Sequence, residues 1–414
     1  MAVIGGGVSG LTAAYLLRRT CHVTLFEREP RLGGHAHSHS VRSGRTSATV
    51  DSGFIVLNDR SYPLLRRLFH ELDVGVRPTE MSMGIVCEGC GLQYVGGRGA
   101  KGIFAQRRRL ADPTFWRLLR SVRRFQVLAL AHLEARPNSL ETLGEFLQRH
   151  QFRRHFVAHY ALPVVSCVWS SGYEDSLDYP AAYLFAFLSH HGFLSSGDTP
   201  QWFVVEGGSR SYVNRLRNQL ADVRTASPVI RVRREADGVV IEHGVAGCFE
   251  ADQVVIATHA DEALALLADP SAAEVEVLGA FRYSTNATQL HRDDSVLPEH
   301  RRSRASWNLQ LTSCDQRSDV VQVSYWMNRL QHHPKEHPLV VTLNGAGRVA
   351  PDLIVAEMSY THPLFTPASV AARRRLAALN TDRTAYAGAY HGWGFHEDGC
   401  RSGVAAAAHF GVAW

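Results

Sequence analysis

The sequence predicts an α/β fold with a parallel sheet, because two features of such folds occur in it together. First, the chain opens with a short apolar run, a glycine-rich turn over residues 5–10, an apolar helix and a second apolar run at residues 22–27. Strand, tight turn, helix and strand form the unit from which parallel sheets are built. Second, short Val- and Ile-rich runs separated by turns appear later, at residues 227–232, 238–241 and 252–258. We therefore expect the later runs to return to the sheet that the first strands begin.

The opening turn, Gly5-Gly-Gly7-Val-Ser-Gly10, has the spacing of a dinucleotide-binding turn. Gly5 permits the tight turn, Gly7 lets the backbone approach a pyrophosphate, and Gly10 lets helix and strand pack closely. The helix N-terminus at residues 8–11 directs N–H groups toward the same pyrophosphate. Glu27 ends the second strand, where a carboxylate can accept hydrogen bonds from the adenosine ribose. These residues predict a dinucleotide site and leave NAD and FAD open.

Length and composition indicate a soluble globular protein with room for two domains. Of the 414 residues, 45% are hydrophobic and 20% are charged. We recognise no apolar run long enough to span a bilayer, and no signal peptide, because Met1 leads almost directly into the first strand. That strand is short for the centre of a sheet, which suggests a true start slightly upstream. We expect a cytoplasmic protein.

Seven scattered cysteines, an odd number, fit reduced thiols better than a disulfide framework. Cys87 and Cys90 form a Cys-x-x-Cys pair in the turn of a hairpin expected over residues 81–97. No second pair lies nearby in sequence at metal-site spacing, so we favour a coincidence at a turn over a zinc or redox site, and we predict no metal. Three alternating histidines share one face of an extended segment, where a polar loop beside the cofactor is favoured over a metal site: His35, His37 and His39.

The middle of the chain is predicted to be mostly helical, over residues 62–72 and 105–190. Residues 106–125 combine an apolar stripe with seven arginines, and such a surface can lie on anionic lipid headgroups. We favour a solvated outer face over this peripheral membrane contact. Nucleic acid is excluded as a partner because no basic–aromatic recognition motif accompanies the arginines. A second apolar stretch, residues 179–194, either lines a pocket or fills core.

The end of the chain predicts a strand, a glycine-rich loop over residues 388–399 and a helix through the alanine-rich residues 404–408. The N-terminus of this helix offers a second set of N–H groups, which suits an electron-rich ligand such as the pyrimidine end of a flavin. Two further strand-like runs precede it, at residues 320–326 and 338–343.

Six motifs follow one another along the chain: the glycine turn, Glu27, Arg31-x-Gly33-Gly34, Asp51-x-Gly53, Gly207-Gly208 and Gly388–Gly399. This order resembles the flavin-containing amine oxidase and phytoene desaturase superfamily across essentially the whole chain. The Arg-x-Gly-Gly doublet favours FAD over NAD. The resemblance implies a Rossmann-type, glutathione-reductase-like FAD-binding domain that is interleaved with an α+β substrate domain. The FAD-binding part is then expected at residues 1–80, 200–272 and 346–414, and the substrate part at residues 81–199 and 273–345.

A narrower set of motifs points to one subgroup of this superfamily. It includes Val50-Asp51-Ser-Gly53-Phe54, Tyr62-Pro63, Trp169-Ser170, Tyr325-Trp326-Met327-Asn328 and Gly394-Phe395-His396-Glu397-Asp398-Gly399. These motifs look like the FAD-dependent oxidoreductases that resemble the flavoprotein portion attached to plant cyclopropane fatty acid synthases. Bacterial members are often associated with fatty-acid-modifying enzymes, so the resemblance suggests an apolar, acyl-lipid-like substrate.

The resemblance also assigns residues to the cofactor. Gly5, Gly7, Ser9 and Gly10 are expected at the pyrophosphate, and Glu27 at the ribose. Phosphates and ribityl chain are assigned to Arg31, Gly33 and Gly34, the border of the isoalloxazine to Gly53 and Phe54, and the adenine to the backbone of Val229. Asp398, Gly399 and Cys400 are expected at the ribityl and pyrimidine end, and His35 and Gly388 complete the cofactor-binding set.

Two departures from the amine oxidases stand out. His35 replaces an arginine that many of them carry, and the run from Phe281 to Leu290 has no lysine, although they commonly place one near the flavin there. Lys101 and Lys335 are the only lysines in the chain. The candidate bases that the resemblance brings near the flavin are His291, His396 and Glu397, each with an alternative structural role.

The favoured function is that of an FAD-dependent oxidoreductase which oxidises or desaturates C–H bonds by hydride transfer to flavin. The alternatives are an amine or amino-acid oxidase, a polyene desaturase, or a non-catalytic FAD-binding accessory protein of a lipid-modifying enzyme. An NAD-dependent dehydrogenase is the least favoured alternative.

Overall fold

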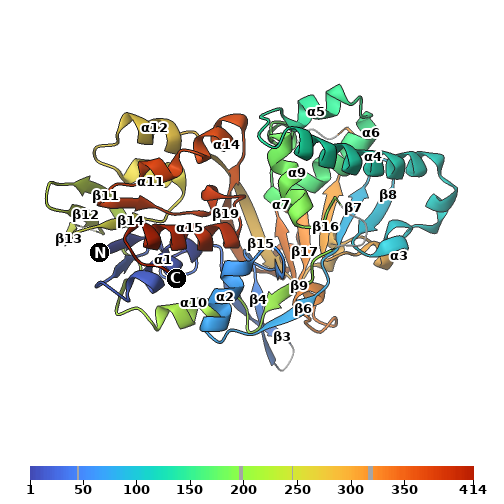
Figure 1. Cartoon of the computed structure of the whole chain (residues 1–414). Helices are drawn as coiled ribbons and strands as arrows, with labels where there is room; N and C mark the ends of the chain where they lie inside the picture. The colour runs from blue at the N-terminus through green and yellow to red at the C-terminus, as the bar shows by residue number, and fades with distance from the viewer. Residues whose placement is uncertain (44–45, 195–198, 245, 316–319) are drawn as a thin grey trace.

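The computed structural model describes residues 1–43, 46–194, 199–244, 246–315 and 320–414. Figure 1 shows two neighbouring parts: a parallel sheet with its helices at the left, and a larger mixed sheet with a helical layer above it at the right. Both chain ends lie in the left part. Among the described residues, no helix has the length and apolar character needed to cross a membrane.

The predicted parallel sheet is confirmed, and its five strands come from both halves of the chain. The strand order is β10 (Asp222–Arg224), β2 (Thr24–Phe26), β1 (Ala2–Ile4), β14 (Val254–Ile256) and β20 (Thr384–Tyr386). Every neighbouring pair runs parallel. The central strand β1 is fully buried and entirely apolar, because both faces of the sheet are covered: Val3 packs in a cluster with Leu11 and Leu16, and Ala2 and Ile4 pack in another with Val232 and Ile241. The run at residues 252–258 therefore returns to the opening sheet, as expected.

The prediction that the runs at residues 227–232 and 238–241 join the parallel sheet is wrong. β11 (Val229–Arg234), β12 (Val239–His243) and β13 (Gly247–Ala251) form a separate antiparallel sheet of three strands. Short turns join these strands, and short turns favour antiparallel pairing of neighbours over insertion into a parallel sheet.

The two ends of the chain are joined by the packing of α1 (Val8–Leu17) against α15 (His396–His409). A side chain at Gly399 would meet Val8 and Ser9, and one at Gly403 would come within 2.4 Å of the Ser9 carbonyl. Both helices therefore run in the same direction, with their N-termini together. The predicted loop over residues 396–399 is wrong, because it forms the first turn of α15. Gly399 and Gly403 have no side chain, and this allows α1 and α15 to approach each other closely.

The larger sheet has seven strands in the order β19 (Ile354–Leu364), β15 (Arg282–His291), β18 (Val340–Leu343), β17 (Gln322–Trp326), β16 (Trp307–Leu311), β7 (Met83–Cys87) and β8 (Leu92–Gly96). The predicted hairpin over residues 81–97 is confirmed as β7 and β8. Only the β16–β7 pair runs parallel.

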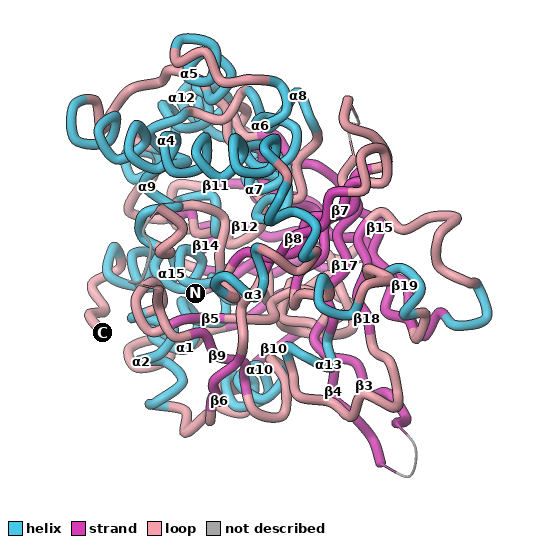
Figure 2. The backbone as a smooth tube through the Cα atoms, turned by 90° about the vertical axis from the view of Figure 1, so that its right-hand side faces the viewer, coloured by secondary structure: helices cyan, strands magenta, loops and turns pink. Residues whose placement is uncertain are grey.

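The predicted helical region is also confirmed, and Figure 2 shows it as a layer above the strands. Its helices are α4 (Pro113–Ala135), α5 (Leu143–Arg149), α6 (Arg154–Phe156), α7 (Leu162–Trp169), α8 (Tyr173–Leu177) and α9 (Ala181–His190). The Asp112 carboxylate accepts hydrogen bonds from the backbone N–H groups of Thr114 and Phe115, which fixes the start of α4. Aromatic side chains from this layer, among them Phe115, Phe146 and Phe185, form a buried cluster.

Smaller elements join the two parts. α2 (Pro63–Glu71) confirms the helix predicted at residues 62–72, and β5 (Leu57–Asn58), β9 (Trp202–Val205) and β6 (Val76–Thr79) form a three-stranded sheet. β3 (Ser38–Ser43) pairs with β4 (Thr46–Asp51) in a hairpin. The remaining helices of the fold include α3 (Gly99–Ile103), α10 (Arg210–Arg217), α11 (Ala260–Leu266), α12 (Ala272–Leu278), α13 (Met327–Leu330) and α14 (Pro367–Arg373).

The division into domains stays a prediction. One observation bears on where its last boundary belongs: β19 lies within the stretch assigned to the FAD-binding part, and along its whole length it pairs with β15 of the larger sheet.

Candidate active site

A cavity of about 870 Å³ lies between the two parts of the molecule. Its wall combines the carboxyl ends of β1 and β2 and the start of α1 with residues of β19, α7, α9 and the start of α15. Clefts at the carboxyl ends of parallel strands are the usual ligand sites of such sheets. Most of the predicted cofactor residues line it: Gly5, Gly7, Ser9, Glu27, Arg31, Gly33, Gly34, His35, Gly53, Phe54, Val229 and Gly388.

The glycine turn leaves room for a ligand at the start of α1. Gly5 adopts φ +102°, a conformation that side chains rarely take, and Gly7 is the N-terminal cap residue of α1. A Cβ added at Gly7 would meet no atom within 4 Å, although the residue lines the cavity. No described side chain caps α1, and its first turn carries no acid. The helix therefore presents backbone N–H groups and a positive dipole to an anion at this point.

Gly10 contributes packing instead of a cavity surface. A Cβ at this position would lie 1.9 Å from the carbonyl oxygen of Gly5. Gly10 therefore lets α1 pass close to the turn that precedes it, as the sequence predicts, and it is not part of the cavity wall.

Glu27 is held at the end of β2 by two backbone N–H groups. Its Oε2 atom accepts a hydrogen bond from Gly6 (2.7 Å) and its Oε1 atom accepts one from Glu29 (2.8 Å). Each carboxylate oxygen keeps a second lone pair for a ligand hydroxyl. The Arg31 guanidinium donates to the carbonyl oxygen of Gly34 (2.8 Å), which braces the glycine doublet. The residues at this end of the cavity thus match a ribose and a pyrophosphate.

Phe54, which the resemblance assigns to the border of the isoalloxazine, lies in the cavity wall beside His396. Their rings stack with centroids 3.8 Å apart and planes 12° apart. Burial lowers the pKa of His396 to about 3, so its ring is neutral at physiological pH. Its Nε2 atom and the hydroxyl of Tyr390 are buried without a hydrogen-bond partner among the described residues, and both residues line the cavity.

A group of neutral histidines surrounds this end. Burial lowers the pKa of His362 to about 4, with a further contribution from His259. Burial and the neighbouring His362 and His259 also hold the pKa of His35 well below its usual range. The His35 ring hydrogen bonds to the Thr361 carbonyl oxygen (3.1 Å), so it replaces the expected arginine with an uncharged group. His37 bonds to the Tyr360 hydroxyl (3.0 Å) in the same wall.

The start of α15 does not place all its predicted residues in the cavity. Asp398 accepts hydrogen bonds from the backbone N–H groups of Trp393 (2.9 Å) and Phe395 (3.1 Å) and so organises the loop before the helix. Gly399 packs on α1, and Cys400 is fully buried in the core beside it. The α15 N-terminus still points toward the cavity, because it lies beside that of α1.

Two of the three candidate bases lie outside the cavity wall. Glu397 accepts hydrogen bonds from the backbone N–H groups of Leu64 (3.0 Å) and Leu65 (2.9 Å), so it caps the N-terminus of α2. His291 is fully buried near the end of β15 and bonds to the Thr342 hydroxyl (2.7 Å). Of the three, only His396 lines the cavity.

Several cavity residues were not among the sequence-predicted site residues. Four of them belong to the motifs of the narrower resemblance: Tyr62, Trp169, Ser170 and Tyr325. Those motifs could have predicted their place in the wall. The stretch at residues 179–194, left open between pocket and core, contributes Phe187, His191 and Phe193 to the wall. Tyr360, Thr361 and His362 carried no signal, because β19 reaches the cavity only through its pairing with β15.

Asp51 and the Gly207-Gly208-Ser209 segment form a brace behind the wall. The Asp51 carboxylate accepts hydrogen bonds from the backbone N–H (2.9 Å) and the hydroxyl (2.7 Å) of Ser209, and from the Gln331 side chain (2.7 Å). A Cβ at Gly208 would crowd this carboxylate at 3.2 Å. The motif therefore fixes Ser52 and Gly53, which follow Asp51 into the cavity.

These features fit FAD. Unpaired helix N–H groups and an open cradle at Gly7 suit its pyrophosphate, the Glu27 carboxylate suits its ribose, and the buried unpartnered atoms of His396 and Tyr390 lie at the end where its ring would be held.

Comparison with known proteins agrees with this fit. Over 75 residues, or 18% of this chain, the sequence is 41% identical to the carotenoid phi-ring synthase of Streptomyces griseus, and the match spans only 14% of that protein's length. Three solved structures, each below 20% identical, share the fold over 99% of this chain and 98% of their own. They are putrescine oxidase bound to putrescine (16% identity, TM-score 0.69), cyclohexylamine oxidase from Brevibacterium oxydans IH-35A (15%, 0.67) and a CLA-producing fatty acid isomerase from P. acnes (17%, 0.69).

The model of the family described as "Flavin containing amine oxidoreductase" matches residues 8–351, which is most of the chain. The predicted fold class, cofactor and superfamily are thereby confirmed. The chain belongs to the flavin containing amine oxidoreductase family, and it is an FAD-dependent oxidoreductase.

Proposed function

We propose that this enzyme oxidises a C–H bond of an apolar, acyl-lipid-like substrate. The observation that carries the proposal is the set of aromatic and aliphatic side chains in the cavity wall: Ile55, Val56, Met81, Val168, Trp169, Phe187, Phe193, Trp202, Trp307, Tyr325 and Leu343. Apolar lining of this kind favours a substrate without charge near its reacting carbon.

The titratable groups of the wall support the same class of substrate. Both lysines of the chain are exposed and lie outside the wall. The histidines near Phe54 are held neutral by burial, so they bring no positive charge to that part of the wall at neutral pH. An unpolarised C–H bond needs little acid–base assistance, whereas amine oxidation requires a route for the amine's proton. The likeness in fold to a fatty acid isomerase, at 17% identity, is consistent with the proposed substrate class.

The chain's own residues would then bind, orient and dehydrate the reactants. Bound FAD supplies the acceptor for the hydrogen and the two electrons that leave the C–H bond. The start of α1 and Glu27 would anchor the dinucleotide, and Phe54, supported by His396, would border the ring. Trp169, Phe187 and Tyr325 exclude water and orient the carbon chain. We assign no general base.

Anaerobic bleaching of the purified flavoprotein tests the proposal. Unsaturated, cyclopropane-containing and branched acyl lipids should reduce the bound flavin, and simple amines should not. A matched variant, Phe187→Asp, places a charge in the apolar wall and should abolish bleaching by lipids while FAD remains bound. Bleaching by amines alone would contradict the substrate class. Bound FAD that no lipid or amine reduces would favour the accessory-protein alternative.

The helical layer carries a surface on which a lipid substrate can approach. Leu110 (54% exposed) and Trp116 (41% exposed) lie beside the exposed arginines of α4, and the Trp116 indole N–H donates to the Leu110 carbonyl oxygen (2.9 Å). A solvated outer helix does not need exposed apolar side chains next to its arginines. We therefore propose that this surface makes a peripheral contact with anionic membranes. Sedimentation with anionic but not with neutral vesicles, lost in Trp116→Glu, would support it. Seven free thiols favour a reducing compartment, and we propose the cytoplasm.

A further inference from the structure

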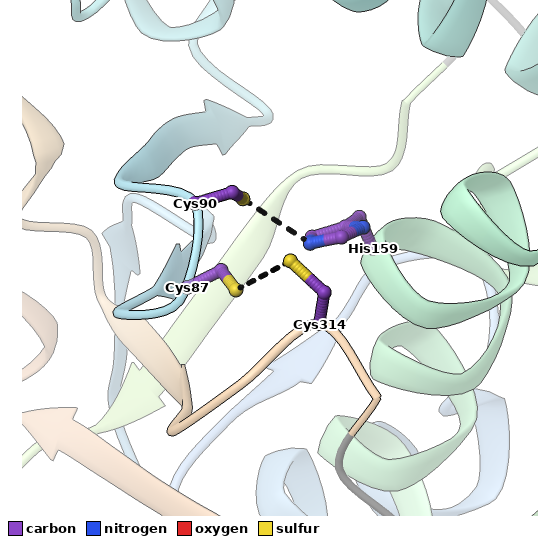
Figure 3. Close-up of side chains that lie close together, drawn as sticks. All are labelled: Cys87, Cys90, His159 and Cys314. Carbon is purple, nitrogen blue, oxygen red and sulfur yellow. Dashed lines mark hydrogen bonds between the residues drawn. The ribbon is translucent and has the colours of Figure 1, made fainter.

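Three cysteines and a histidine converge at the edge of the seven-stranded sheet, away from the cofactor cavity. Cys87 ends β7 and Cys90 lies in the following turn, while Cys314 follows β16 and His159 belongs to the π-helical segment Val157–Ala161. Figure 3 shows the Cys90 sulfur facing the His159 ring and the Cys87 sulfur facing Cys314. The four ligand atoms all lie within 4.8 Å of one another.

We propose that these four residues bind one zinc ion. Two of the spacings between these atoms match the edges of a zinc tetrahedron. With Zn–S bonds of about 2.3 Å and Zn–N bonds of about 2.0–2.1 Å, two sulfurs lie about 3.8 Å apart, and a sulfur and a nitrogen about 3.5 Å apart. The Cys87 and Cys314 sulfurs are 3.7 Å apart, and the Cys90 sulfur is 3.5 Å from the His159 Nε2 atom. Three thiolates and one imidazole form one of the usual ligand sets of structural zinc.

The surroundings prepare His159 for this role. Its ring is fully buried, and its Nδ1 atom bonds to the His155 carbonyl oxygen (2.9 Å). That partner requires the proton on Nδ1 and leaves the Nε2 lone pair directed at the cysteines, as is usual for histidines that bind metals. π-Helical turns are rare and occur frequently at functional sites.

The two loops approach each other closely enough to share an ion. A Cβ at Gly89, between Cys87 and Cys90, would lie 3.1 Å from the Cα atom of Ser313, so a side chain there would push the hairpin away from Cys314. Gly91 adopts φ +61°, which turns the chain back into β8 immediately after Cys90. Arg109 donates to the Cys90 carbonyl oxygen (3.3 Å) and places a positive charge beside a group of three thiolates.

The ion would fasten the helical layer to the sheet. His159 is separated by 69 residues from Cys90, and Cys87 by 227 residues from Cys314. A ligand that joins segments so distant in sequence stabilises the folded state, because the unfolded chain offers no preformed site.

Metal analysis of the full-length flavoprotein tests the proposal. Protein purified under reducing, chelator-free conditions should contain one zinc per chain, and chelation should lower its thermal midpoint. Cys314→Ser and His159→Gln should lose the zinc while retaining FAD. Cys248→Ser, at an exposed cysteine on β13, is the matched control and should keep it.

Cobalt provides a measurement that does not depend on the variants folding. Wild-type protein freed of zinc and supplied with cobalt(II) should show the intense visible bands of a tetrahedral thiolate site. Absence of zinc and of these bands in wild-type protein would overturn the proposal. So would zinc retained undiminished in Cys314→Ser, or a Cys87–Cys314 disulfide in place of the metal.

Discussion

The imidazole of His396 lies flat against the ring of Phe54, with the ring centroids 3.8 Å apart and an angle of 12° between the planes. The two residues come from opposite ends of the chain, and both line the cavity. Because the pKa of His396 is lowered to about 3 and its Nε2 atom is buried, the ring supports Phe54 more readily than it transfers protons.

This contact predicts that His396→Phe preserves function and that His396→Ala does not. Phenylalanine keeps a flat ring against Phe54, so the rate of substrate-driven flavin reduction should stay within about threefold, whereas alanine should slow it by roughly tenfold or more through misplacement of the ring wall. Stopped-flow absorbance under anaerobic conditions measures both rates. His409→Ala, at an exposed histidine of the same helix, is the control. Equal losses in both His396 variants would indicate a proton-transfer role instead.

Gly7 and Gly10 predict opposite consequences of adding a side chain to one turn. Gly7→Ala should weaken FAD binding by roughly tenfold or more without lowering the stability of the apoprotein, because the added Cβ meets no protein atom and enters only the cradle at the cavity. Gly10→Ala should instead lower the free energy of unfolding by about 1–3 kcal/mol, because its Cβ would overlap the Gly5 carbonyl oxygen. Fluorescence titration with FAD and denaturant unfolding separate the two effects. A stable Gly10→Ala protein with normal FAD affinity would contradict the packing role.

The neutral histidines predict a loss of stability in mild acid. The folded-state pKa of His362, about 4, lies below the usual 6.5, so the unfolded chain takes up its proton first as the pH falls. The contribution of neutral His362 to the free energy of unfolding is therefore fully present above pH 6.5 and is lost as the pH falls toward 4. At pH 5 this loss amounts to about 2 kcal/mol. Denaturant unfolding at pH 7.5 and pH 5 should show a smaller acid loss in His362→Gln than in wild type. His409→Gln should behave as wild type does, and an unchanged acid loss in His362→Gln would refute the assignment.

Glu397 predicts a dependence of the opposite sign. Burial raises its pKa to about 7, so its contribution to stability is fully present below pH 4.5 and is lost as the pH rises toward 7. Wild type should lose this free energy of unfolding between pH 4.5 and pH 8, whereas Glu397→Gln, which does not ionise, should keep it. The variant should therefore gain up to about 3 kcal/mol relative to wild type over this range. Glu134→Gln, at an exposed residue of α4, is the control. Flavin reduction should be unaffected, because Glu397 caps α2 outside the cavity; a large kinetic defect would restore it as a catalytic candidate.

Local sequence was sufficient wherever neighbouring residues determine the backbone. The turn from Gly5 to Gly10 predicts the strand–helix start of a dinucleotide site, because spacing and chirality leave few other conformations for three glycines in that pattern. Glu27 follows from its position at the end of β2. The β7–β8 hairpin and α2 follow from apolar periodicity of 2 and 3.6 residues.

Other features depend on contacts between distant segments. Gly399 is predicted from sequence to end a loop, but it lies in the first turn of α15, where it packs against α1. Val229 and its strand read as part of the parallel sheet, but short turns keep them in a sheet of their own. The pairing of β19 with β15 brings His362 to the cavity, while β15 ends with His291 buried away from it.

The sequence by itself determined the cofactor end of this protein, because pyrophosphate and ribose are recognised by a short continuous segment. Only the tertiary structure decided what surrounds the reactive end and what lies beside the Cys87–Cys90 turn. Cys314 and His159 are far from that turn along the chain. Their closeness to it results from the topology of the sheet and helices, which no local sequence pattern predicts. The physical reason is the same in both places: backbone conformation is local, whereas a cavity wall or a ligand tetrahedron is assembled from segments that meet only after folding.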